Sequence, residues 1–225
     1  MTKTFEAVFF DMDGTFVNSE PHWLAAETEL MAEYGHAWTH EDQQYCLGGP
    51  LDKVGRYMAS LSGEQKSPEF FRDELVKRTI EHFQSDIEYM PGALELLLEL
   101  KSEGVALGLV TASPEPMMRA TLGRLDENLF DVAISGDDVA VTKPSPEAYL
   151  LAANTLGVNI ENCIVLEDSN TGISAAKASG AFVIAIPMFI SVSPEDRLVV
   201  LDSLSGISAK DLEELYSRDL TEERI

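Results

Sequence analysis

Short apolar runs that alternate with helical patterns constrain the fold of this chain more than any other feature. Five runs are short, continuous and partly β-branched, and they lie at residues 5–10, 105–110, 132–134, 163–166 and 182–186. Such runs are typical of strands that are buried on both faces of a parallel sheet. Helix-period segments lie between them, near 92–103, 114–123, 146–156 and 170–179. The alternation predicts an α/β fold with a doubly wound parallel sheet and right-handed crossovers.

One long stretch interrupts this alternation. Residues 18–88 contain no convincing strand, only helical patterns near 21–34, 51–61 and 68–83. An ordinary crossover needs far fewer than the roughly 70 residues found here. We therefore predict an α/β core of residues 1–17 and 89–225, with an all-helical domain of residues 18–88 inserted after the first strand. In the tail from residue 187, a short amphipathic helix is expected at 209–215.

The balance of charge excludes two classes of partner. The 225 residues carry 16 Lys and Arg against 39 Asp and Glu, a formal net charge of −23. Nucleic acids and anionic membrane surfaces both attract clusters of basic side chains, so we expect neither as a partner. No apolar run approaches the roughly 20 residues of a membrane span, and Cys46 and Cys163 lack the spacing of metal ligands. We expect a cytoplasmic monomer with reduced cysteines.

Polar side chains follow three of the predicted strands, and a lysine precedes a predicted helix. The segments are Asp11-Met12-Asp13-Gly14-Thr15, Thr111-Ala112-Ser113, Glu167-Asp168-Ser169 and Lys143-Pro144. In open α/β sheets, ligands bind beyond the carboxyl ends of the strands. We therefore expect four carboxylates, two hydroxyls and one ammonium at the same edge of the sheet.

Crowded carboxylates of this kind need a cation among them, because they otherwise raise one another's pKa. Oxygen ligands without His or Cys suit a hard ion, Mg²⁺ in particular. Lys143 adds a further positive charge, and N–H groups in the turn at 111–114 could hold the oxygens of an anion. The expected ligand is a small phosphorylated metabolite.

The same groups predict a reaction. Asp11 could attack phosphorus to form an aspartyl-phosphate. Asp13 could protonate the leaving alkoxide and then take a proton from water. Thr111 and Ser113 would position the phosphoryl oxygens. Each residue taken alone is also a common turn or helix-cap residue, and it is their coincidence at one edge that favours a functional site.

In these residues the chain resembles the haloacid dehalogenase superfamily, specifically its β-phosphoglucomutase-like sugar-phosphate phosphatases. The resemblance covers residues 5–187. The segment Asp11-Met12-Asp13-Gly14-Thr15 is similar to the first motif of the family, Thr111 to the second, Lys143 to the third and Glu167-Asp168 to the fourth.

The resemblance implies magnesium-dependent hydrolysis of a sugar or polyol phosphate, with Asp11 as nucleophile and Asp13 as general acid and base. It implies magnesium bound by Asp11, the backbone carbonyl of Asp13 and Asp168, with Glu167 bound directly or through water. It also implies a substrate-binding group that comprises Gly14, Thr111, Ala112, Ser113 and Lys143. Residues 18–88 would be the mobile cap of the family.

Departures from the family pattern bear on the choice of reaction. The mutases carry Gly-x-Ser-Arg in the cap, where this chain reads Gly48-Gly49-Pro50-Leu51, and Trp23 stands where they have a hinge His. Both changes favour hydrolysis, while a β-phosphoglucomutase-type phosphotransferase remains the alternative. We also expect His22 and Trp23 to shape the leaving-group pocket.

A receiver-like phospho-aspartate signalling module is a second alternative, from a different class of protein. Such modules also combine Asp, Thr or Ser, and Lys at strand ends. They place the phosphorylated Asp on a later strand and lack an insertion of this length, so this alternative is disfavoured. Hexose, deoxyhexose and polyol phosphates all remain open as substrates.

Overall fold

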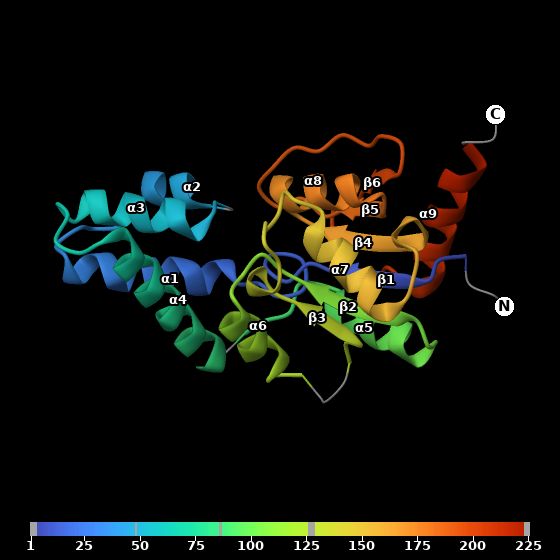
Figure 1. Ribbon diagram of the computed structural model, residues 1–225, viewed down its shortest axis with the longest axis horizontal. Coiled ribbons are helices and arrows are strands. Elements are labelled where there is room, and N and C mark those ends of the chain that lie inside the picture. Colours follow the sequence, from blue (N-terminus) through green and yellow to red (C-terminus); the bar gives the residue numbers. More distant parts are fainter. Residues whose placement is uncertain (1–3, 48, 86, 126–128, 223–225) are drawn as a thin grey trace. The chain divides into compact units, whose positions relative to one another are not determined.

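The computed structural model describes residues 4–47, 49–85, 87–125 and 129–222 (Figure 1). The chain divides into two compact units, which are described separately. The first comprises residues 1–18 and 88–225, and the second comprises Ser19–Ile87. None of the helices within the described residues is both long and apolar enough to cross a membrane.

The first unit is built on a six-stranded sheet. Its strands are β1 (Ala7–Phe10), β2 (Ala106–Val110), β3 (Val132–Ile134), β4 (Cys163–Glu167), β5 (Phe182–Ala185) and β6 (Leu198–Val200). All pairings are parallel and the order is β3-β2-β1-β4-β5-β6. Phe10 pairs with Leu109 on one side and Leu166 on the other, so the ends of the three central strands lie level. The predicted α/β fold with its parallel sheet is confirmed.

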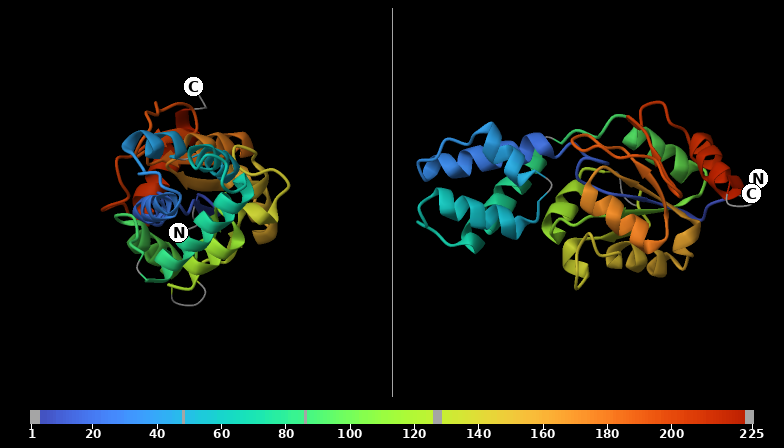
Figure 2. Two further views of the ribbon diagram at one scale, coloured as in Figure 1. Left: turned by 90° about the vertical axis from the view of Figure 1, so that its left-hand side faces the viewer. Right: turned by 90° about the horizontal axis from the view of Figure 1, so that it is seen from above.

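Helices cover both faces of this sheet. The helices of the unit are α5 (Ala93–Ser102), α6 (Glu115–Leu122), α7 (Glu147–Leu156), α8 (Asn170–Ser179) and α9 (Ala209–Glu222). Helix α7 packs on α8, whereas α5 packs on α9. The right-hand view of Figure 2 shows the sheet between these two pairs of helices. Because all four residues of β1 are buried, its alternating side chains supply apolar contacts to both helical layers.

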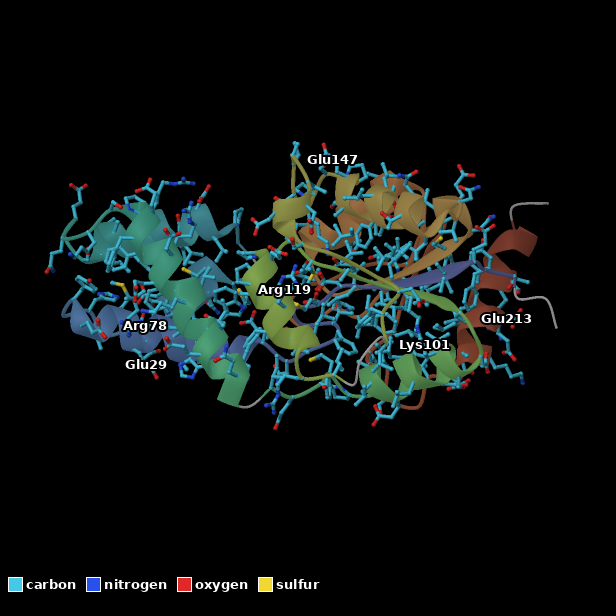
Figure 3. All side chains as sticks on the ribbon, turned by 60° about the horizontal axis from the view of Figure 1, so that its bottom comes forward. Glu29, Arg78, Lys101, Arg119, Glu147 and Glu213 are labelled. Atoms are coloured by element: carbon cyan, nitrogen blue, oxygen red, sulfur yellow. The ribbon has the colours of Figure 1, made fainter. Side chains whose placement is uncertain are left out.

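The second unit is made of helices with a core of its own. Its helices are α1 (Glu20–Glu33), α2 (His40–Cys46), α3 (Leu51–Leu61) and α4 (Pro68–Ser85). Their apolar faces meet in one cluster that includes Leu30, Met58 and Phe71. Ion pairs join α1 to α4 at the surface, where Arg78 Nη2 lies 2.9 Å from Glu33 Oε1 (Arg78 is labelled in Figure 3).

Close approach of α3 to α4 depends on a glycine. A Cβ atom at Gly55 would lie 2.4 Å from the carbonyl oxygen of Pro68, well inside van der Waals contact. A larger side chain at this position would force the two helices apart. The packing of α3 against α4 therefore requires a glycine at this position.

Candidate active site

A tight turn after β1 presents Asp11 and Asp13. The Asp11 N–H donates to the carbonyl of Leu166 at 3.0 Å, which extends the pairing of β1 with β4 by one residue. The chain then turns at Gly14, whose φ is +84° and whose N–H donates to the carbonyl of Val17 at 2.9 Å. Strand β1 ends at Phe10 and the chain bends at Met12, between the two aspartates, so their side chains occupy different surroundings.

Gly14 also permits a close contact with the loop that follows β4. A Cβ atom at Gly14 would lie 2.5 Å from Oδ2 of Asp168. The next residue, Thr15, donates from Oγ1 to Oδ1 of Asp168 at 3.2 Å. The turn after β1 thus fixes the position of the Asp168 carboxylate.

Lys143 lies at the centre of the cluster with its ammonium fully engaged. Its Nζ donates to Asp11 Oδ1 at 2.5 Å, to Glu167 Oε1 at 2.7 Å and to the carbonyl of Val110 at 2.9 Å. The side chain is only 3% exposed. A charged amine this deeply buried is stable only because all of its N–H groups have oxygen acceptors.

Glu167, the last residue of β4, is fully buried and saturated with hydrogen bonds. Oε1 accepts from Lys143 and from the Tyr149 hydroxyl, the latter at 3.0 Å. Oε2 accepts from the Asp168 and Ser169 N–H groups and from Ser169 Oγ, at 3.1, 3.2 and 3.1 Å. Five donors therefore hold this one carboxylate in a single orientation.

Asp13 forms a separate group with the hydroxyls that follow β2. Its Oδ2 accepts from Ser113 Oγ at 2.7 Å and from Thr111 Oγ1 at 3.2 Å. Its Oδ1 is buried and has no hydrogen-bond partner in the described part of the chain. The hydroxyls of Thr111 and Ser113 thus orient Asp13, a contact that the sequence did not predict, and leave Oδ1 free for another group.

The pKa values show an excess of negative charge around Lys143. Burial and the Glu167 carboxylate raise the pKa of Asp11 well above its usual value, although Lys143 opposes this. Burial and Glu167 also raise the pKa of Asp168 to about 8. For Lys143 burial lowers the pKa, but Asp11 and Glu167 outweigh it and the pKa is raised. One ammonium is too little positive charge for three neighbouring carboxylates.

A hard divalent cation fits this set of donors. Asp11, Glu167 and Asp168 each offer an oxygen atom within 4.8 Å of the others. The donors are carboxylates, the ligands that Mg²⁺ prefers. The charge that such an ion brings would offset the repulsion that raises the pKa values of Asp11 and Asp168.

Comparison with known proteins identifies the family. A sequence model described as haloacid dehalogenase-like hydrolase matches residues 8–186, which include every residue of the cluster. The chain belongs to the haloacid dehalogenase-like hydrolase family. The resemblance to this family is thereby confirmed.

Relatives of the chain within this family are named as phosphatases. The chain is 36% identical to the phosphorylated carbohydrates phosphatase of Thermotoga maritima, over 78% of this chain and 82% of that protein. It is 32% identical to hexitol phosphatase B of Escherichia coli, over 80% of this chain and 83% of that protein. A crystal structure of CbbY from Rhodobacter sphaeroides in complex with phosphate has a TM-score of 0.78 and 28% identity, and the match covers 93% of this chain and 99% of that one.

Two expected site residues of this haloacid dehalogenase-like hydrolase lie in the helical unit. The ring centroid of His22 lies 5.4 Å from that of Phe83, and Trp23 packs against the apolar core of that unit. Their expected part in a leaving-group pocket stays a prediction. Of the four residues that stand in place of the mutase motif, Gly48 lies outside the described residues.

Tyr149 is a site residue that sequence reasoning missed. It lies on α7, is fully buried, and reaches Glu167 through its hydroxyl. The sequence held one signal for it. On the buried face of the helix that follows Lys143, Tyr149 is flanked by Ala148, Ala152 and Ala153. A tyrosine among small apolar residues needs a polar partner for its hydroxyl.

Proposed function

We propose that this protein is a magnesium-dependent phosphomonoester hydrolase that acts on a small sugar or polyol phosphate through an aspartyl-phosphate. The observation that carries the proposal is the position of the Asp11 carboxylate. Its Oδ1 accepts a hydrogen bond from the Lys143 ammonium at 2.5 Å. An oxygen of the same carboxylate lies within 4.8 Å of one of Asp168, and Asp13 follows two residues later in the chain. Relatives named for phosphorylated carbohydrates and for hexitol support this class of substrate.

Magnesium would be held by Asp11, Asp168 and the main-chain carbonyl of Asp13. Glu167 already accepts five hydrogen bonds, so we assign it an outer position in which it aligns Lys143 and the loop after β4. When bound, the ion supplies positive charge next to the phosphoryl oxygens and to Asp11.

In the proposed reaction, the two aspartates and the hydroxyls after β2 have different roles. An oxygen of Asp11 attacks phosphorus, a bond from Asp11 to phosphorus forms, and the bond from phosphorus to the substrate oxygen breaks. Asp13 gives its proton to the leaving alkoxide and then accepts a proton from the water that cleaves the aspartyl-phosphate. Thr111 and Ser113 hold Oδ2 of Asp13, so its buried and unpartnered Oδ1 is the atom we assign to proton transfer.

Release of orthophosphate tests the proposal directly. Sugar and polyol phosphates are incubated with the protein with Mg²⁺ and with EDTA, and we expect turnover only with the metal. Asp11→Asn removes the nucleophile and should lower kcat by about a thousandfold or more. Asp202→Asn, at an exposed carboxylate in the tail, is the matched control and should match wild type.

Two outcomes would contradict the proposal. Wild-type rates in Asp11→Asn would show that this carboxylate does not attack phosphorus. Conversion of one organic phosphate into another, with no orthophosphate released, would indicate a phosphotransferase of the β-phosphoglucomutase type.

A further inference from the structure

The Lys143 ammonium has no free N–H group for a substrate. An ammonium has three N–H donors, and in Lys143 these are taken by Asp11 Oδ1, Glu167 Oε1 and the carbonyl of Val110. The ring of Tyr149 covers a further side, with its centroid 4.8 Å from Nζ. Lys143 must therefore give up one of its three acceptors before it can donate to a phosphoryl oxygen.

The three hydrogen bonds of Lys143 differ in what it costs to break them. The contact with Asp11 holds the proposed nucleophile and balances its charge, so its loss would work against the reaction. Glu167 Oε1 is the acceptor that has a second donor, the Tyr149 hydroxyl at 3.0 Å. This oxygen stays hydrogen-bonded when Lys143 turns away, which avoids the cost of an unsatisfied buried carboxylate oxygen.

Packing keeps the Tyr149 hydroxyl next to Glu167 when Lys143 moves. Its side chain is fully buried on α7, between the sheet and the helical layer, and packs among apolar residues of the core. Its hydroxyl is therefore held near Glu167 by packing as well as by the hydrogen bond. A rigid aromatic donor of this kind costs little conformational entropy to keep in place.

We propose that Tyr149 is a positioning residue that allows Lys143 to exchange Glu167 for a phosphoryl oxygen of the substrate. The exchange is one of hydrogen bonds alone: the Lys143 N–H leaves Glu167 Oε1, and the Tyr149 hydroxyl remains its donor. This inference rests on the proposed phosphatase function and deepens it. It gives Tyr149 a part in substrate binding although its side chain does not contact the substrate.

The test is Tyr149→Phe, which keeps the ring and removes the donor. We expect KM and the dissociation constant of orthophosphate, measured by calorimetry in Mg²⁺, to rise together about tenfold, equivalent to ~1.4 kcal/mol. We expect kcat to change less than about threefold, because the lost contact affects bound phosphoryl groups equally in the ground and transition states.

Tyr216→Phe is the matched control. Tyr216 is also buried and its hydroxyl donates to the carbonyl of Glu161 at 3.2 Å, near the amino ends of the strands. Both variants should lose comparable thermal stability, whereas only Tyr149→Phe should bind phosphate more weakly. An unchanged KM and an unchanged orthophosphate affinity in Tyr149→Phe would overturn the inference and leave Tyr149 a packing residue.

A second measurement covers the case in which Tyr149→Phe does not fold. With 3-fluorotyrosine at position 149 of the otherwise native chain, orthophosphate binding should shift the fluorine resonance. The reason is that Glu167 Oε1 accepts from both Lys143 and Tyr149 in the free protein, and from Tyr149 alone after Lys143 has moved to the phosphate. The same label at position 216 should not respond, and a silent label at 149 contradicts the inference. Failure of the proposed function is distinct: wild type would then neither release nor bind orthophosphate.

Discussion

At the scale of single residues, the helical unit contains a buried acid that no part of the proposed reaction uses. Glu27 on α1 is 4% exposed, and its Oε2 has no hydrogen-bond partner among the described residues. Burial, and to a smaller extent the charge of Glu20, raise the pKa of Glu27 to about 8. Glu27 is therefore protonated in the native state near neutral pH, where the unfolded chain would ionise it.

This difference makes the stability of the helical unit depend on pH. The native state holds the Glu27 proton up to about pH 8, and the unfolded state releases it near the ordinary value of 4.5. Between these two values the native state binds more protons, so the stability contributed by Glu27 is full below the lower value and falls as pH rises towards the upper one.

Glu27→Gln should remove this dependence. Each unit of pKa shift corresponds to about 1.4 kcal/mol, so the stability of the variant relative to wild type should increase by about 2 kcal/mol or more between pH 5 and pH 8.5. Urea denaturation across that range measures the difference. Glu81→Gln, at an exposed carboxylate on α4, is the control and should show a flat difference. A flat difference for Glu27→Gln would show that Glu27 ionises normally.

The residues of the candidate site were predictable to the extent that they adjoin strands. Asp11, Thr111 and Glu167 stand at or just beyond the ends of apolar runs, so the sheet itself brings them together. Tyr149 and Thr15 act through contacts with residues far away in sequence, Glu167 and Asp168. Periodicity along the chain holds no information about such partners, which is why these two contacts were not predicted.

At the scale of elements, α8 approaches the site more closely than a side chain would permit. A Cβ atom at Gly172 would lie 1.6 Å from Glu167 Oε1. The helix begins at the Ser169 cap, whose hydroxyl accepts from the Gly172 N–H at 3.0 Å. The absence of a side chain at position 172 therefore allows the first turn of α8 to cover the Glu167 carboxylate.

Gly172→Ala tests whether the contact with Glu167 outweighs the higher helix propensity of alanine. Helix propensity alone would favour Ala over Gly by about 0.5–1 kcal/mol. The contact with Glu167 should outweigh this and destabilise the protein, with a loss of kcat/KM because Glu167 and Lys143 would move. Thermal unfolding and phosphate release measure both effects. Ser174→Ala, on the exposed face of α8, should change neither; a stabilised Gly172→Ala variant would contradict the close packing.

Elements were predictable where their pattern was long or wholly apolar. The five apolar runs became β1 to β5, since strands buried on both faces leave little ambiguity. Strand β6 (Leu198–Val200) was missed although it is apolar, because no helical pattern separates it from β5 as one separates the other strands. Helix α2 (His40–Cys46) was missed because seven residues are too short to establish a helical period. Helix α2 depends instead on a capping box between Thr39 and Asp42. Helix α9 extends to Glu222, beyond the short helix expected at 209–215.

At the scale of the whole molecule, the charge of −23 opposes the approach of an anionic substrate. Acidic residues far outnumber basic ones, and several of the basic residues are already paired. Lys101 Nζ, for example, lies 2.6 Å from Asp131 Oδ1 (Lys101 is labelled in Figure 3). In the proposed reaction, attraction for a phosphate group would therefore be local, at Lys143 and at the proposed cation, while the long-range field is repulsive.

Salt should consequently assist the enzyme. At fixed free Mg²⁺, raising the ionic strength from about 10 mM to about 150 mM should increase kcat/KM for a dianionic substrate by about two- to threefold, because it screens the repulsion. Potassium chloride and tetramethylammonium chloride should act alike if screening is the cause. A steady fall in kcat/KM would indicate that favourable attraction dominates.

The strand order has a consequence for synthesis of the chain. In β1, Ala7 pairs with Ala106 on one side and with Cys163 on the other. At ribosomal speeds, roughly eight to thirty seconds separate the emergence of Phe10 from that of Cys163. The first strand of this sheet to be made is thus paired on its second side only when β4 follows, and the inserted residues Ser19–Ile87 lengthen the delay. Until β4 has been made, one edge of this apolar strand stays unpaired and exposed to aggregation.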